Sequence, residues 1–161
     1  MTRFRELLAR LTQARVEFVV IGGVAVIVHG HPRATLDLDI CYARSPENID
    51  RLASALAPIH PHLRGAPPEL PFLWDSRTLR NGLNFTLVTD EGEIDLLGEV
   101  TGLGNYGDIA LRAVELELYG TAIRVLALDD LIRSKAAAGR AKDLVDLEAL
   151  RVLAENRRSG S

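Results

Sequence analysis

Cysteine and lysine are scarce in this chain of 161 residues, and long apolar runs are missing. The only cysteine is Cys41, so no disulfide framework can hold the fold together, and a reducing compartment suits the protein. No apolar run is long enough to span a bilayer, and no basic and apolar leader opens the sequence. We therefore expect a cytoplasmic protein that makes no use of a membrane.

Excess positive charge is also missing. The sequence holds 19 basic and 22 acidic residues, which gives a net charge of −3. This balance disfavours a broad electrostatic nucleic-acid binder, although it allows a local basic face. Only two of the basic residues are lysines, Lys135 and Lys142. Their closeness is either a coincidence or a sign that a compact ammonium is needed there instead of a guanidinium.

The length and a hydrophobic content of 47% fit one domain with a core of ordinary size. We expect that domain over residues 1–155, followed by a flexible polar tail over 156–161. Apolar spacing predicts helices at 3–14, 46–57, 130–138 and 142–154, and strands at 16–21, 36–43, 84–88 and 93–97. Segments 113–119 and 121–126 are either a further strand pair or an extended crossing. Five of the seven prolines lie between 58 and 71, which predicts a loop.

The rest of the chain is organised around residues 18–40, where an apolar strand runs into Gly22-Gly23 and a Val/Ala/Ile segment. Two local structures fit the residues that follow. The β-forming side chains of Val24 and Val26 to Val28 favour a hairpin slightly. The alternative is a glycine turn that opens a helix ending at Gly30.

Asp37 and Asp39 lie two positions apart in the strand predicted at 36–43, so their side chains share one face. Taken alone, such a pair also fits an ordinary solvent-facing sheet. Two carboxylates this close repel each other unless a cation lies between them. Mg²⁺ is the usual partner, because it binds carboxylates together with phosphate oxygens. We therefore expect Mg²⁺, or Mn²⁺ in its place, and a nucleoside triphosphate.

A third acid is expected from the strand predicted at 93–97. Asp95 has apolar neighbours on both sides, which favours it over Glu93 on the same strand face. Three carboxylates could hold two metal ions, an arrangement that stabilises the attacking and the leaving oxygen of an in-line displacement. Asp37, Asp39 and Asp95 are therefore our candidate catalytic and metal-binding residues.

Phosphate contacts are expected from several sides of the same site. Gly22 and Gly23 can offer backbone N–H groups to phosphate oxygens. Arg33 can bind a phosphate with two nitrogens, and Lys135 can neutralise charge on the departing pyrophosphate. His29 and His31 are expected to pack or to contact substrate, because a Mg²⁺ site prefers oxygen ligands.

These residues resemble the signature of minimal nucleotidyltransferases of the DNA polymerase beta superfamily. That signature is a hydrophobic residue followed by Gly-Gly or Gly-Ser, a spacer, Asp-x-Asp, and a third acid on a later strand. Here it reads Ile21-Gly22-Gly23, then Asp37-Leu38-Asp39, then Asp95. Two longer motifs, HG-x-P-R-A-T before the acids and SKAAAGRAKD-x-x-D later, are most similar to the branch that contains abortive-infection and toxin–antitoxin nucleotidyltransferases.

The resemblance implies an α+β fold, with a mixed twisted sheet packed by helices and a helical C-terminus. It implies that Val24 to Gly30 is helical. It also implies transfer of a nucleoside monophosphate from an NTP to a hydroxyl of RNA, such as a tRNA end, or of a protein. A cognate toxin or antitoxin partner is implied as well, and a protein-AMPylating antitoxin and a non-catalytic nucleotide- or partner-binding module are the alternatives.

The residues that the resemblance adds to the nucleotide site are Thr35, Arg140, Lys142 and Asp143, and Asp146 next to them. Asp143 and Asp146 also fit a simpler role as acids at a helix N-terminus.

Overall fold

The computed structural model describes residues 1–67 and 69–160. Most of its strands come from segments in which apolar and polar residues alternate. They are β1 Phe18–Ile21, β2 Asp37–Tyr42, β3 His62–Leu63, β4 Asn84–Thr89, β5 Gly92–Leu97, β8 Val114–Leu118 and β9 Thr121–Val125. These strands form one sheet in the order β3-β4-β5-β2-β1-β9-β8. A small separate ladder pairs β6 Glu99–Val100 with β7 Gly104–Asn105.

The sheet is mixed, as expected. β2 runs parallel to β5 and β1 runs parallel to β9, whereas the other neighbouring pairs are antiparallel. The strands predicted at 84–88 and 93–97 are β4 and β5, which pair as an antiparallel hairpin. Segments 113–119 and 121–126 are the strand pair β8–β9, so the extended crossing is wrong.

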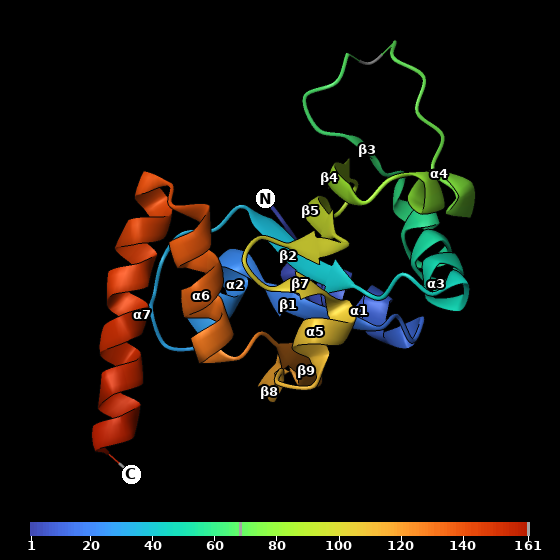
Figure 1. The fold of residues 1–161 in the computed structure, drawn as a ribbon. Coiled ribbons are helices and arrows are strands. Elements are labelled where there is room, and N and C mark those ends of the chain that lie inside the picture. The colour runs from blue at the N-terminus through green and yellow to red at the C-terminus, as the bar shows by residue number, and fades with distance from the viewer. Residues whose placement is uncertain (68, 161) are drawn as a thin grey trace.

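Seven helices accompany the strands in the described part of the chain. They are α1 Phe4–Gln13, α2 Gly22–Val28, α3 Pro46–Leu56, α4 Ser76–Asn81, α5 Tyr106–Ala110, α6 Leu128–Ala138 and α7 Ala141–Ser159, and a short 3-10 turn covers Ala57–Ile59. Figure 1 shows α6 and α7 side by side at one end of the molecule, with α3 and α4 at the other end. None of the helices in the described residues is both long and apolar enough to cross a membrane.

The hydrophobic core forms where the apolar face of the sheet meets α1 and α3. Leu38 and Ile40 of β2 are fully buried, as are Leu7 and Leu11 of α1 and Leu52 of α3. Because residues alternate along a strand, burial of Leu38 and Ile40 places Asp37 and Asp39 on the opposite face. The packing of one face therefore fixes the direction of the acids on the other.

The structure corrects several local predictions. The hairpin after Gly22-Gly23 is wrong, because Gly22–Val28 is the helix α2. The segment expected to be a loop over 58–71 contains the strand β3, and Pro68 in it lies outside the described residues. The last helix continues beyond Ala154 to Ser159, so the polar residues 156–159, expected in a flexible tail, extend α7. Ser161 at the end of that tail also lies outside the described residues.

Candidate active site

Two glycines make the turn from β1 into α2 and bring the backbone close to two polar side chains. Gly22 has a φ of +65°, a conformation that side chains disfavour, and a Cβ at this position would lie 2.0 Å from Asp39 Oδ2. A Cβ at Gly23 would lie 2.6 Å from Thr35 Oγ1. A side chain at either position would therefore clash with a neighbouring site residue, which explains why both positions are glycine.

Pairing between β2 and β5 assembles the acids. In this parallel ladder Asp39 lies opposite Asp95, and Asp37 lies opposite Glu93. Asp37, Asp39 and Asp95 each offer a carboxylate oxygen, and these oxygens lie within 4.8 Å of one another. The structure therefore brings together the three acids proposed from the sequence, while Glu93 lies within 3.5 Å of an arginine, Arg64.

Burial and crowding change the protonation of two of the carboxylates, Asp39 and Asp95. Burial, followed by the charges of Asp37 and Asp95, raises the pKa of Asp39 to about 8. Burial and a hydrogen bond with Asp37 also raise the pKa of Asp95, against an opposing effect of Arg64. Asp39 Oδ1 is buried and has no hydrogen-bond partner among the described residues. An all-oxygen donor set with an unpartnered buried carboxylate oxygen fits a hard divalent cation such as Mg²⁺.

The opposite wall of the site carries cations from the α6–α7 hairpin. Lys135 of α6 is buried, and its Nζ lies 3.2 Å from Asp143 Oδ1 and 3.1 Å from Asp146 Oδ2. Arg140 binds Asp143 with two nitrogens, through Nε at 2.6 Å and Nη2 at 3.2 Å. Burial alone would raise the pKa of Asp143, but hydrogen bonds from Arg140 and Lys135 lower it. Both acids of the hairpin therefore bind cations of the site and do more than cap a helix.

Arg33, in the segment before β2, is also held in an ion pair. Its Nη1 lies 2.6 Å from Asp146 Oδ2, the same oxygen that binds Lys135. Asp146 thus joins the segment before the acids to the α6–α7 hairpin. Lys142 differs from these cations, because it is exposed and makes no ion pair or hydrogen bond with any described residue.

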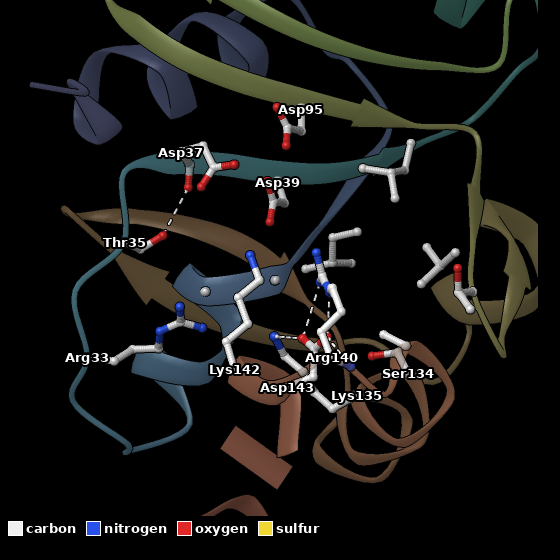
Figure 2. Close-up of a pocket in the computed structure, with 17 residues that line it drawn as sticks. Arg33, Thr35, Asp37, Asp39, Asp95, Ser134, Lys135, Arg140, Lys142 and Asp143 are labelled. Carbon is white, nitrogen blue, oxygen red and sulfur yellow. Dashed lines mark hydrogen bonds and ion pairs between the residues drawn. The ribbon is translucent and has the colours of Figure 1, made fainter. Parts of the chain in front are cut away.

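One cavity collects the catalytic and nucleotide-binding residues proposed from the sequence, except Asp146, which lies behind its wall in contact with Arg33 and Lys135 (Figure 2). It is lined by Gly22, Gly23, Arg33, Thr35, Asp37, Asp39, Asp95, Lys135, Arg140, Lys142 and Asp143. Figure 2 shows the acids on one side and Lys135, Arg140, Lys142 and Asp143 on the other, with the α2 turn and Arg33 beside them. The individual roles assigned to these residues remain predictions.

The cavity also contains residues that sequence reasoning missed. Ile21, Leu97 and Val100 supply an apolar part, and Thr101, Ser134 and Ala138 line it further. Ser134 could have been predicted as a site residue from the sequence, since it directly precedes Lys135 in the SKAAAG segment. Arg64 contacts Asp95 without lining the cavity, and sequence reasoning missed it too. No sequence pattern indicates its role, because it lies in the proline-rich segment and reaches Asp95 only through the pairing of β3 with β4.

His29 is a packing residue. Its Nε2 lies 2.7 Å from the carbonyl oxygen of Leu126, and Arg157 Nη1 lies 3.2 Å from its Nδ1. These contacts fit a neutral ring that donates from Nε2 and accepts at Nδ1. Burial lowers the pKa of His29, which favours the same neutral form.

Comparison with known proteins gives structural matches only: no family model and no curated protein matches this chain. A candidate nucleotidyltransferase from Thermotoga maritima matches with a TM-score of 0.56 and 19% identity, over 97% of this chain and 96% of that one. The lincomycin-bound lincosamide antibiotic adenylyltransferase LnuA matches with a TM-score of 0.61 and 16% identity, over 94% and 98%. ANT(2″)-Ia, in complex with adenylyl-2″-tobramycin, matches with a TM-score of 0.58 and 13% identity, over 97% and 95%.

Identities this low carry the fold and not the function. Each alignment covers nearly all of both chains, so the likeness extends over the whole arrangement of sheet and helices. It agrees with the α+β fold that the sequence resemblance implied. The chain has the fold of the nucleotidyltransferases.

Proposed function

We propose that this protein transfers a nucleoside monophosphate from an NTP to a hydroxyl group of an acceptor, with a divalent cation. The observation that carries the proposal is the cavity in which Asp37, Asp39 and Asp95 face the cationic α6–α7 hairpin across the glycine turn. A polyanionic substrate that brings its own metal ion matches both walls of such a cavity. The fold shared with nucleotidyltransferases supports the same chemistry.

Mg²⁺ or Mn²⁺ would be held by Asp37, Asp39 and Asp95. When bound, a pair of such ions supplies charge stabilisation for the attacking and leaving oxygens of an in-line displacement. The unpartnered Asp39 Oδ1 is the observation that supports this assignment. The two-metal arrangement itself is part of the proposal.

The chain contributes binding and orientation around that centre. Lys142 is a cation on the cavity wall that pairs with none of the residues the structure describes, so we assign it to the triphosphate. Gly22 and Gly23 let phosphate approach the backbone, and Lys135 faces the charge that develops on pyrophosphate. In the reaction the acceptor oxygen forms a bond to the α-phosphorus, and the bond from that phosphorus to the pyrophosphate oxygen breaks. The proton of the acceptor hydroxyl passes to Asp95.

Two classes of acceptor fit the proposed transfer. Resemblance to the toxin–antitoxin branch favours RNA, such as a tRNA end, or a partner protein. The names of two structural neighbours point to small-molecule antibiotics instead: one is a lincosamide adenylyltransferase, and the other holds an adenylylated tobramycin. We place RNA or protein first, in the cytoplasm, where the single buried thiol of Cys41 stays reduced.

A non-catalytic nucleotide-binding module is the second candidate. It is favoured by one observation, that Arg33 and Lys135 are already held by Asp146 in the nucleotide-free chain. In this case the protein would bind Mg·NTP and release it unchanged.

Label transfer separates the two candidates. Purified protein would be incubated with Mg²⁺ and each α-labelled NTP, together with total RNA, lysate protein, lincomycin or tobramycin. We expect label in one acceptor class with one NTP, and no transfer by Asp39→Ala or in EDTA. Label transfer that Asp39→Ala leaves unchanged would refute the assignment of the acids. Tight Mg·NTP binding without transfer to any acceptor would favour the binding module.

A further inference from the structure

Arg64 extends the row of residues that carries the acids across the sheet. Its backbone N–H donates to the carbonyl oxygen of Thr86 at 3.0 Å, directly after the pairing of Leu63 with Leu87. Thr86 in turn lies opposite Asp95, which lies opposite Asp39. Arg64, directly after β3, thus continues the row of Asp39, Asp95 and Thr86 and places a guanidinium at its outer end.

The side chain of Arg64 is fixed by two kinds of acceptor. Its Nη2 donates to Asp95 Oδ1 at 2.7 Å and to the carbonyl oxygen of Leu87 at 3.0 Å. Nη1 lies 3.9 Å from Asp37 Oδ2, and Nε lies 3.5 Å from Glu93 Oε1. The contact with Leu87 holds the guanidinium in place independently of the acids, so Arg64 is positioned before any ligand binds.

The contact with Asp95 uses only one of its carboxylate oxygens. Hydrogen bonds of this kind orient metal-binding carboxylates and keep them aimed at the ion. Arg64 makes no ion pair with Asp39. One guanidinium among four carboxylates also leaves a surplus of negative charge, so Arg64 does not replace a divalent cation.

We propose that Arg64 is a positioning residue, which orients Asp95 toward Asp37 and Asp39 for binding of the divalent cation. The inference rests on the proposed function, because it assigns the acids to a metal site. It predicts that removal of Arg64 weakens binding of the divalent cation. If Arg64 instead competed with the cation for Asp95, its removal would tighten ion binding.

The test is Mn²⁺ binding to the nucleotide-free protein, measured from the electron paramagnetic resonance signal of free Mn²⁺. We expect Arg64→Gln to weaken Mn²⁺ binding by about 10- to 100-fold. Arg64→Lys should give a smaller loss, because an ammonium keeps the charge but lacks the planar guanidinium, whose Nη2 donates to Leu87 and Asp95 while Nη1 and Nε face Asp37 and Glu93. Equal or tighter binding by Arg64→Gln would overturn the inference. Circular dichroism and cooperative unfolding in EDTA check that each variant folds.

A double-mutant cycle separates positioning from a general structural effect. If Arg64 acts through Asp95, Arg64→Gln should change Mn²⁺ affinity by less than about twofold in an Asp95→Asn background. A full additional loss in that background would refute the role. If Arg64→Gln does not fold, the same cycle with Arg64→Lys decides. Wild-type protein that binds no Mn²⁺ would overturn the metal site and this inference together, whereas normal wild-type binding with an unchanged Arg64 variant would overturn this inference alone.

Discussion

At the scale of single residues, Asp39 shows a conflict between stability and the assigned role. Its carboxylate is surrounded by Asp37 and Asp95, lies against Gly22, and has an oxygen without a partner. We expect Asp39→Asn to raise the free energy of unfolding in EDTA at pH 7 by ~1 kcal/mol or more. Burial and the neighbouring acids raise the pKa of Asp39 to about 8, so the folded chain bears the cost of protonating this carboxyl, and a neutral amide avoids that cost. The same variant should lose Mg²⁺-dependent stabilisation. Chemical denaturation with and without Mg²⁺ measures both effects, and a destabilised variant in EDTA would contradict the expectation.

The two lysines of the cavity should respond in opposite ways to the same substitution. Lys142 makes no ion pair or hydrogen bond with any described residue, so Lys142→Gln should weaken Mg·ATP binding by about tenfold or more and leave stability unchanged. Lys135 is buried between Asp143 and Asp146, so Lys135→Gln should cost roughly 3 kcal/mol of stability. Calorimetric titration and thermal unfolding of both variants give the comparison. Equal losses of stability would refute the distinction.

At the scale of elements, the turn between β1 and α2 is specified by its contact with β2. Gly22→Ala should cost about 1–2 kcal/mol for its left-handed backbone and about 1–3 kcal/mol more for displacing Asp39. Gly120 is a matched control, because its φ is +79° and no atom of another described residue lies within 4 Å of a Cβ built there, its chain neighbours aside. Gly120→Ala should therefore show only the backbone cost. Urea unfolding of the two variants tests this, and equal losses would show that the contact with Asp39 has no weight.

The local sequence pattern was sufficient to predict some elements of the fold and insufficient to predict others. Alternation of apolar and acidic residues predicted which face Asp37 and Asp39 occupy, because burial of Leu38 and Ile40 leaves one arrangement. Local propensity favoured a hairpin after Gly22, and packing of α2 against the sheet and α6 overrode it. The resemblance, not the propensity, led to the correct helix.

At the scale of the whole molecule, contacts between distant segments determine what sequence reasoning could not find. Arg64 meets Asp95 only once β3 is paired with β4, and Arg33 meets Asp146 only once α7 is docked. Neither arginine lies at a helical or strand spacing from its acidic partner, so no sequence pattern predicts the pair. The acids could therefore be predicted from the sequence, whereas the partners of the cations could not.

Helix docking also gives the molecule a pH dependence, through His29. Its contacts with Leu126 and Arg157 join α2 to α7 and to the connection between β9 and α6. Burial lowers the pKa of His29 from 6.5, so the unfolded chain takes up the proton more readily than the folded chain. Stability should therefore fall as the pH drops below about 6.5. His29→Gln should show a smaller loss between pH 7.5 and 5.5, and an identical pH profile for both proteins in urea unfolding would contradict this role.

The order of the site along the chain has a consequence for protein synthesis. The acids are complete once Asp95 has been made, whereas Lys135 and Asp146 come from the α6–α7 hairpin near the C-terminal end. A nascent chain emerging from the ribosome therefore presents the acidic wall before the cationic wall exists, and β1 cannot gain its neighbour β9 until late in translation. We therefore expect nucleotide binding to arise only after the α6–α7 hairpin has emerged.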